Sequence, residues 1–215
     1  MIRAASLLAS LTLLGGCISL LPEPPPAPRT FALQAGDVAA LQGQRIDAVI
    51  GVTAPGGSRA VLAADVIWRT GDELAYVAQT QWADHAADAL QSMLVETLAR
   101  QGRFAGATVA GEARAGYEIR WEVTNFEIDG DAMQARFRAD VRVLASPGRR
   151  LIAQEVITAE APVASRSATE ASQALTRAAR EGSARIGVFA ADAAAQAEAQ
   201  AAAEEDHARA ASIRR

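Results

Sequence analysis

The clearest pattern in the chain is a regular alternation of apolar and charged residues in its second half. Apolar residues occupy every second position over residues 117–123 and again over residues 135–143, with charged residues between them. A period of two places the two sets of side chains on opposite faces of a strand. Asp129, Gly130 and Asp131 lie between the runs and have the chemistry of a turn. The pattern predicts a long antiparallel hairpin with one apolar and one charged face.

Shorter runs predict further strands around this hairpin. Residues 45–52 alternate as a strand does, and residues 66–69 and 74–79 flank a turn-rich link that suits a second hairpin. Residues 53–58 contain proline and two glycines and are expected to form a loop. Residues 151–160 predict one more strand, so that three consecutive antiparallel strands are expected in the second half.

The pattern changes to a helical period after Trp82. Asp84 is the expected N-cap, because its carboxylate can accept bonds from the free amides of the first turn. Gly102 is expected to end the helix in a left-handed conformation. The apolar stripe between them contains Ala86, Leu90, Met93, Leu94, Thr97 and Leu98.

A second helical pattern begins at Ala168, with Ser167 or Thr169 as its expected cap. Its apolar stripe continues to Ala194. Residues 195–215 are rich in alanine, glutamine and charge, which leaves two alternatives open: a protruding helix or a frayed tail.

The order of these elements predicts the fold class. Strands and hairpins alternate with two helices, and no internal repeat is present. We expect an α/β protein with a single domain over residues 30–194, in which a mixed β-sheet packs against helices. The long antiparallel hairpin and the alanine-rich helix form its C-terminal part.

The first 17 residues have the pattern of a secretory leader that ends in a lipidation site. One positive charge and a short apolar core precede Gly15 and Gly16, and the only cysteine, Cys17, follows them. We expect residues 1–16 to be a lipoprotein signal peptide and Cys17 to be acylated. The alternatives are a plain leader with an unmodified thiol or a transmembrane helix, for which the apolar stretch is short.

Residues 17–29 are rich in proline. Proline restricts the backbone and removes amide donors, so this segment is expected to be an extended, semi-rigid tether. The alternative is a peptide ligand for a proline-binding module.

Charge narrows the range of functions. The whole chain has a formal net charge of −4, and Arg3 is the only charged residue of the leader. An acidic protein lacks the basic face that nucleic acid requires, so we expect no nucleic-acid partner.

No catalytic or metal site is evident. The two histidines, His85 and His207, lie far apart in sequence, and Cys17 is the sole thiol, so zinc ligation is not expected. Asp129 and Asp131 are better explained by the turn than by acid–base catalysis. We predict no cofactor and no enzymatic activity.

Four residues are candidates for contact with a partner or a lipid. Arg136 and Arg138 belong to the charged face of the hairpin, and Trp68 and Trp82 could line a groove. The alternatives are cross-strand ion pairs of the arginines with acids such as Glu118, Glu122 and Asp140, and closure of the core by the tryptophans.

The chain resembles the ABC-type transport auxiliary lipoproteins of the paraquat-inducible-protein C type. The resemblance extends over nearly the whole mature chain to about Ala194. The features that carry it are, in chain order, the Leu14–Cys17 lipobox, the proline spacer, Phe31-Ala32-Leu33, Val52-Thr53-Ala54-Pro55, Val66-Ile67-Trp68-Arg69, Leu74-Ala75-Tyr76, Trp82 before the helix, Leu94 to Leu98, Gly102-Arg103-Phe104, Tyr117 with Ile119, Phe126 and the final alanine-rich helix. The chain departs from the family at His85-Ala86, where a proline is usual, and at Gly56-Gly57-Ser58-Arg59.

The resemblance implies a fold similar to the N-terminal domain of TolB, a mixed sheet between helices. It also implies a periplasmic protein without catalysis, anchored to a membrane by its lipid and associated with an MCE-domain protein and its ABC permease and ATPase. Ile18, which follows the cysteine in place of aspartate, favours the outer membrane over the inner one. A homo-oligomer is a further expectation.

Two other functions stay open at this point. One is an adaptor for outer-membrane assembly, which cross-linking to a β-barrel would identify. The other is a periplasmic hydrolase, which an activity-based serine probe would label.

Overall fold

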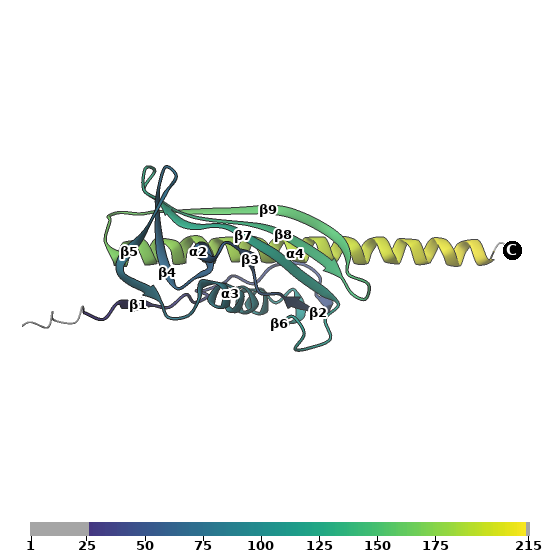
Figure 1. Ribbon diagram of the computed structural model, residues 1–215. Helices are drawn as coiled ribbons and strands as arrows, with labels where there is room; N and C mark the ends of the chain where they lie inside the picture. Colours follow the sequence, from purple (N-terminus) through teal and green to yellow (C-terminus); the bar gives the residue numbers. More distant parts are fainter. Residues whose placement is uncertain (1–25, 214–215) are drawn as a thin grey trace, which may run out of the picture.

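Strand β7 (Tyr117–Asp129) organises the sheet. In this computed structural model, which describes residues 26–213, β7 pairs antiparallel with β8 (Gln134–Ala145), and β8 pairs with β9 (Arg150–Pro162) (Figure 1). Trp121 lies opposite Val141 and Phe126 opposite Phe137. The three consecutive antiparallel strands are therefore present as expected from the alternation.

The other edge of β7 pairs in parallel with three shorter strands in succession. These are β2 (Ile46–Val52), β3 (Gly56–Gly57) and β4 (Asp65–Thr70). Beyond them, β6 (Phe104–Val109) pairs parallel with β2, β5 (Glu73–Trp82) pairs antiparallel with β4, and β1 (Arg29–Phe31) pairs parallel with β5. Within residues 26–213, the nine strands form one mixed sheet.

The segment expected to be a loop at residues 53–58 contains β3 and leads into a short helix. Helix α2 (Arg59–Leu62) begins after Ser58, whose hydroxyl accepts a hydrogen bond from the amide of Val61 at 3.3 Å. The loop prediction was thus incomplete, because the two-residue pairing of Gly56 and Gly57 with β7 has no local sequence signature.

Helix α3 (Ala86–Gln101) ends as predicted and begins differently. Gly102 adopts the left-handed conformation with φ of 69° and closes the helix by donating to the carbonyl of Leu98. The N-cap position belongs to His85, not Asp84, and no side chain caps the helix there. The amide of Ala86 instead donates to the carbonyl of Ala63 at 3.0 Å, so the connection before β4 satisfies an amide at the start of the helix.

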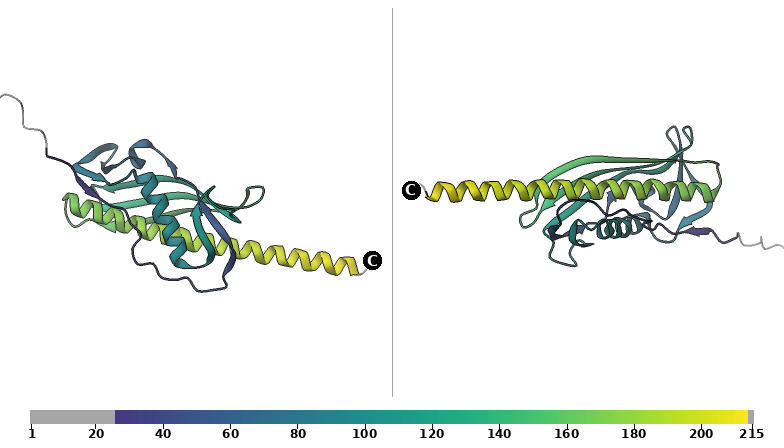
Figure 2. Two further views of the ribbon diagram at one scale, coloured as in Figure 1. Left: turned by 90° about the horizontal axis from the view of Figure 1, so that it is seen from below. Right: turned by 180° about the vertical axis from the view of Figure 1, so that it is seen from behind.

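Helix α4 (Ala168–Ile213) is long and only partly packed. The Ser167 hydroxyl accepts a hydrogen bond from the amide of Glu170 at 3.3 Å, so Ser167 is its cap. The last buried residue is Ala194, and residues 198–212 are exposed on the protruding end of the helix (Figure 2). Of the two alternatives for this segment, the structure has the helix. Among the described helices, none combines the length and apolarity needed to cross a bilayer.

Helices α3 and α4 contact each other and cover the same face of the sheet (Figure 2). This differs from the arrangement of a sheet between helices that the family resemblance implied. The apolar residues of β7 and β8, such as Ile119, Val123 and Val141, are fully buried beneath the helices. Among the described residues, no long helix covers the opposite face of β7, β8 and β9 (Figure 1), which carries the charged side chains of the alternation.

Candidate partner-binding surface

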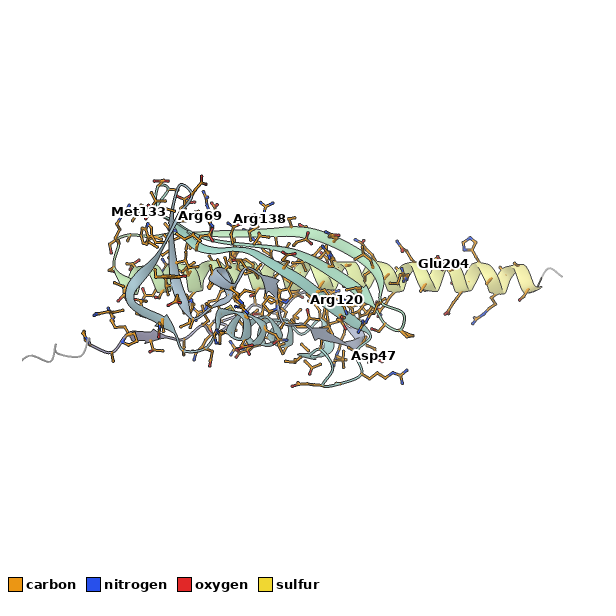
Figure 3. The ribbon with its side chains drawn as sticks, viewed as in Figure 1. Asp47, Arg69, Arg120, Met133, Arg138 and Glu204 are labelled. Carbon is orange, nitrogen blue, oxygen red and sulfur yellow. The ribbon has the colours of Figure 1, made fainter. Side chains whose placement is uncertain are left out.

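The charged side of β7, β8 and β9 is an exposed surface on which the strands arrange side chains in regular rows. We call it the open face. Figure 3 shows Arg138 on this side of the sheet, away from α4, with Arg69 nearer the hairpin tips and Arg120 toward the other end. Its charged members are Glu118, Arg120, Glu122, Glu127, Asp129, Arg136, Arg138, Asp140, Arg142 and Glu160.

Two of the arginines pair along their own strand. The guanidinium of Arg120 lies 2.6 Å from the carboxylate of Glu118, and that of Arg142 lies 3.6 Å from Asp140. Ion pairs of Arg120 and Arg142 are thus present as expected, but these two run along a strand and not between strands. Residues two apart on a strand share a face, and an arginine side chain is long enough to reach that neighbour.

Arg136 makes the cross-strand pairs that the register allows. Its guanidinium lies 2.7 Å from Asp129 on β7 and 3.3 Å from Glu160 on β9. Arg138 is different: it is exposed and forms no ion pair with any residue that the structure describes. Of the two arginines expected to contact a partner, Arg138 is therefore the one whose charge is not already engaged.

A buried ion pair joins β4 to β7 at the edge of the open face. Arg69 donates to Glu127 at 3.0 Å, and the side chain of Glu127 is only 2% exposed. Asn125 donates to the same carboxylate oxygen at 2.6 Å, while the other oxygen has no partner among the described residues. This pair was not expected, because the alternation alone assigns Glu127 to a solvated face.

The turn between β7 and β8 holds Asp129 in its charged form. The backbone amide of Ala132 lowers the pKa of Asp129 most, and the amide of Asp131 and the guanidiniums of Arg136 and Arg69 act in the same direction against a raising effect of burial. Asp129 Oδ1 accepts from these two amides at 2.8 and 2.9 Å. The turn chemistry expected for Asp129-Gly130-Asp131 is thus observed.

The two candidate tryptophans occupy different environments. Trp82 is 3% exposed and stacks on Phe126 with ring centroids 5.7 Å apart. It closes the core, which corrects the suggestion that it lines a partner groove. Trp68 is partly exposed at the end of the sheet, where the guanidinium of Arg166 lies 5.1 Å from its ring centroid.

The remaining residues singled out in the sequence do not converge. Cys17 lies outside the described residues. His85 is exposed before α3, and His207 is exposed on the protruding end of α4, where its Nδ1 lies 2.8 Å from the carbonyl of Ala203. Within residues 26–213, no group of three or more histidine, cysteine, aspartate or glutamate residues is arranged to hold a metal ion.

Comparison with known proteins identifies the family. The family described as the ABC-type transport auxiliary lipoprotein component matches residues 31–187, and the chain belongs to it. The family predicted from the sequence is thereby confirmed, and with it an auxiliary role in ABC-type transport. No curated protein was found to match the chain.

Two solved structures share the fold. One is a DUF330 protein from Xanthomonas campestris, with a TM-score of 0.72 and 19% identity over 80% of this chain and 99% of that one. The other is an uncharacterized protein with a TM-score of 0.61 and 13% identity over 76% of this chain and 99% of that one. These similarities confirm the mixed α/β fold of a single domain.

Proposed function

We propose that this chain is a lipid-anchored, non-catalytic accessory subunit of an ABC transporter that works with an MCE-domain protein. The transporter would move lipids or other hydrophobic molecules between the inner and outer membranes. Membership of the auxiliary lipoprotein family over residues 31–187 supports the transport role. The lipobox supports acylation of Cys17, and Ile18 supports a position at the periplasmic face of the outer membrane.

The observation that best supports a docking role is the asymmetry of the sheet. One face of β7, β8 and β9 is buried by α4, whereas the other presents charged side chains to solvent. Most of the arginines on that face already have carboxylate partners, and Arg138 has none among the described residues. A free guanidinium in the middle of a rigid sheet favours a bidentate contact with an acidic group of a partner protein. We therefore assign partner docking to the open face around Arg138.

Charge reversal at Arg138 tests this assignment. The Arg138→Glu variant should recover severalfold less of the MCE-domain protein when the tagged lipoprotein is purified from detergent-solubilised membranes. Arg114→Glu is a matched control, because Arg114 is also an exposed arginine but precedes β7 in a loop. If Arg138→Glu and Arg114→Glu recovered equal amounts of the MCE-domain protein, this result would contradict docking through the open face.

The anchor is tested separately by mass spectrometry of the mature protein. We expect an N-terminus at Cys17 that carries acyl chains. Cys17→Ala should move the protein out of the membrane fraction and reproduce the envelope permeability defect caused by loss of the gene. A mature protein that retains a free thiol at Cys17 would count against an anchored subunit.

A further inference from the structure

Strand β5 carries an exposed apolar patch at the end of the molecule from which the N-terminal segment leaves (Figure 1). Leu74 is 42% exposed and Tyr76 is 62% exposed. Strand β1 pairs only with Thr80–Trp82, so within the described residues the outer edge of β5 is unpaired over residues 73–79. Long exposed apolar edges promote aggregation unless something covers them. We therefore expect another molecule or a membrane to cover this patch.

A shallow hollow adjoins the patch. It has a volume of about 390 Å³, and its walls include Trp68, Ala75, Val77 and Arg166 as well as Tyr76. The indole nitrogen of Trp68 is buried and has no hydrogen-bond partner among the described residues. The guanidinium of Arg166 lies over the same ring. Apolar walls and a cation thus meet at the outer edge of β5, which suits an amphipathic boundary.

The position of the N-terminal segment limits what can lie against this surface. Arg29, the first residue of β1, is opposite Thr80, and Tyr76 precedes Thr80 by four residues on β5. At ~3.3 Å per residue, Tyr76 lies roughly 13 Å along the strand from the pairing with β1. Cys17 precedes Arg29 by twelve residues, and a chain of that length reaches at most about 43 Å. A bilayer that holds an acyl chain on Cys17 is therefore within reach of the patch.

We propose that the β5 patch rests on the bilayer into which the Cys17 lipid inserts. Tyr76 and Leu74 enter the interface, and Arg166 faces the phosphate layer. This proposal rests on the proposed acylation of Cys17. Tyrosine is favoured at membrane interfaces, because its ring is apolar and its hydroxyl stays hydrated. The lipid tether raises the local concentration of the membrane, so a small patch is sufficient to orient the domain.

Apolar contact, rather than net charge, stabilises the association of the β5 patch with the bilayer. The tip next to the patch bears Asp72 and Glu73, whereas Arg69 is already paired with Glu127 and Arg166 adds one positive charge. A surface without an excess of positive charge has no preference for anionic lipid. The contact should therefore form on zwitterionic phosphatidylcholine vesicles and persist in high salt.

The same orientation sets the direction of α4. The protruding end of the helix points away from the end at which β1 and the patch lie (Figures 1 and 2). With β5 on the bilayer, residues 198–212 would extend away from the membrane surface.

The lone cysteine of the chain makes a selective test available. Once Cys17 is acylated, Leu74→Cys provides the only free thiol for an environment-sensitive fluorophore, and it leaves Tyr76 in place. The matched control is Leu151→Cys, because Leu151 is 51% exposed and lies on β9 at the end of the sheet far from the β4–β5 hairpin (Figure 1). The full-length acylated proteins are reconstituted in phosphatidylcholine vesicles, with and without lipids that carry a quencher in the acyl chain.

We expect the label at position 74 to shift its emission to the blue and to be quenched severalfold more than the label at position 151. Adding Tyr76→Ser should reduce the quenching at position 74. If the labels at positions 74 and 151 both showed water-like emission on vesicle-bound protein, the placement of the β5 patch on the bilayer would be wrong. The lipid anchor at Cys17 would still stand. Protein that does not float with the vesicles would overturn the anchor, and the placement with it.

Discussion

A methyl group at position 182 of α4 would collide with the core. Gly182 lies against the ring of Phe137 on β8, and a Cβ atom there would stand 2.2 Å from Cδ1 and 2.4 Å from Cε1 of that ring. Phe137 is 1% exposed, so its ring is enclosed by the core. Overpacking costs about 1–3 kcal/mol, and a clash this short belongs at the upper end. Replacing glycine by alanine in a helix returns about 1 kcal/mol. We expect Gly182→Ala to lower the free energy of unfolding by about 2 kcal/mol.

Urea unfolding followed by far-UV circular dichroism measures this change, and thermal unfolding should show a melting temperature lower by about 4–8 °C. The matched variant is Phe137→Leu, which removes the ring edge that Gly182 contacts. Once Phe137→Leu is present, adding Gly182→Ala should cost far less than it does alone, because the two residues are coupled. The reasoning would be refuted if Gly182→Ala stabilised the protein, or if its cost were the same in both backgrounds.

Three further predictions follow from the open face and the helix. Arg69→Met should destabilise the protein by about 2–3 kcal/mol, because it leaves the buried carboxylate of Glu127 without its cation; the cost is below that of a fully buried pair since Arg69 is 34% exposed. Adding Glu127→Gln should restore most of the loss in urea unfolding. The lowered pKa of Asp129 means that its contribution to stability is present above the ordinary carboxyl pKa and is lost as the pH falls through the lower folded value. Asp129→Asn should therefore flatten the acid limb of a plot of unfolding free energy against pH; an unchanged limb would refute this. Deleting residues 201–215 should change the unfolding free energy by less than about 0.5 kcal/mol, as calorimetry would show, because residues 201–212 are exposed.

The sequence predicts the parts of the fold whose signals are local. Alternation at positions 117–123 and 135–143 identifies β7, β8 and their buried face, because a strand with one solvated face must repeat every two residues. The parallel pairing of β7 with β2, β3 and β4 leaves no such trace. It joins segments far apart in the chain, and those short strands are selected by packing more than by their own residues. The same reason explains why β3 was expected to be a loop.

The candidate surface was less predictable than the fold. The charge pattern places the arginines on one face, but only the structure distinguishes Arg138 from Arg136, which is already paired with Asp129 and Glu160. The two tryptophans are equivalent in sequence terms, since both lie at strand ends. Their burial differs because Trp82 stacks on Phe126 within the core, whereas Trp68 is partly exposed beneath the guanidinium of Arg166. Nothing in the pattern of residues 73–79 indicates that Leu74 and Tyr76 stay exposed.

Capture of the intact lipoprotein tests the central claim most directly. The tagged wild-type protein is purified from membranes after brief cross-linking, and the bound proteins are identified by mass spectrometry. An accessory transport subunit should recover an MCE-domain protein together with an ABC permease and ATPase. Recovery of an outer-membrane β-barrel without these components would contradict the proposed function.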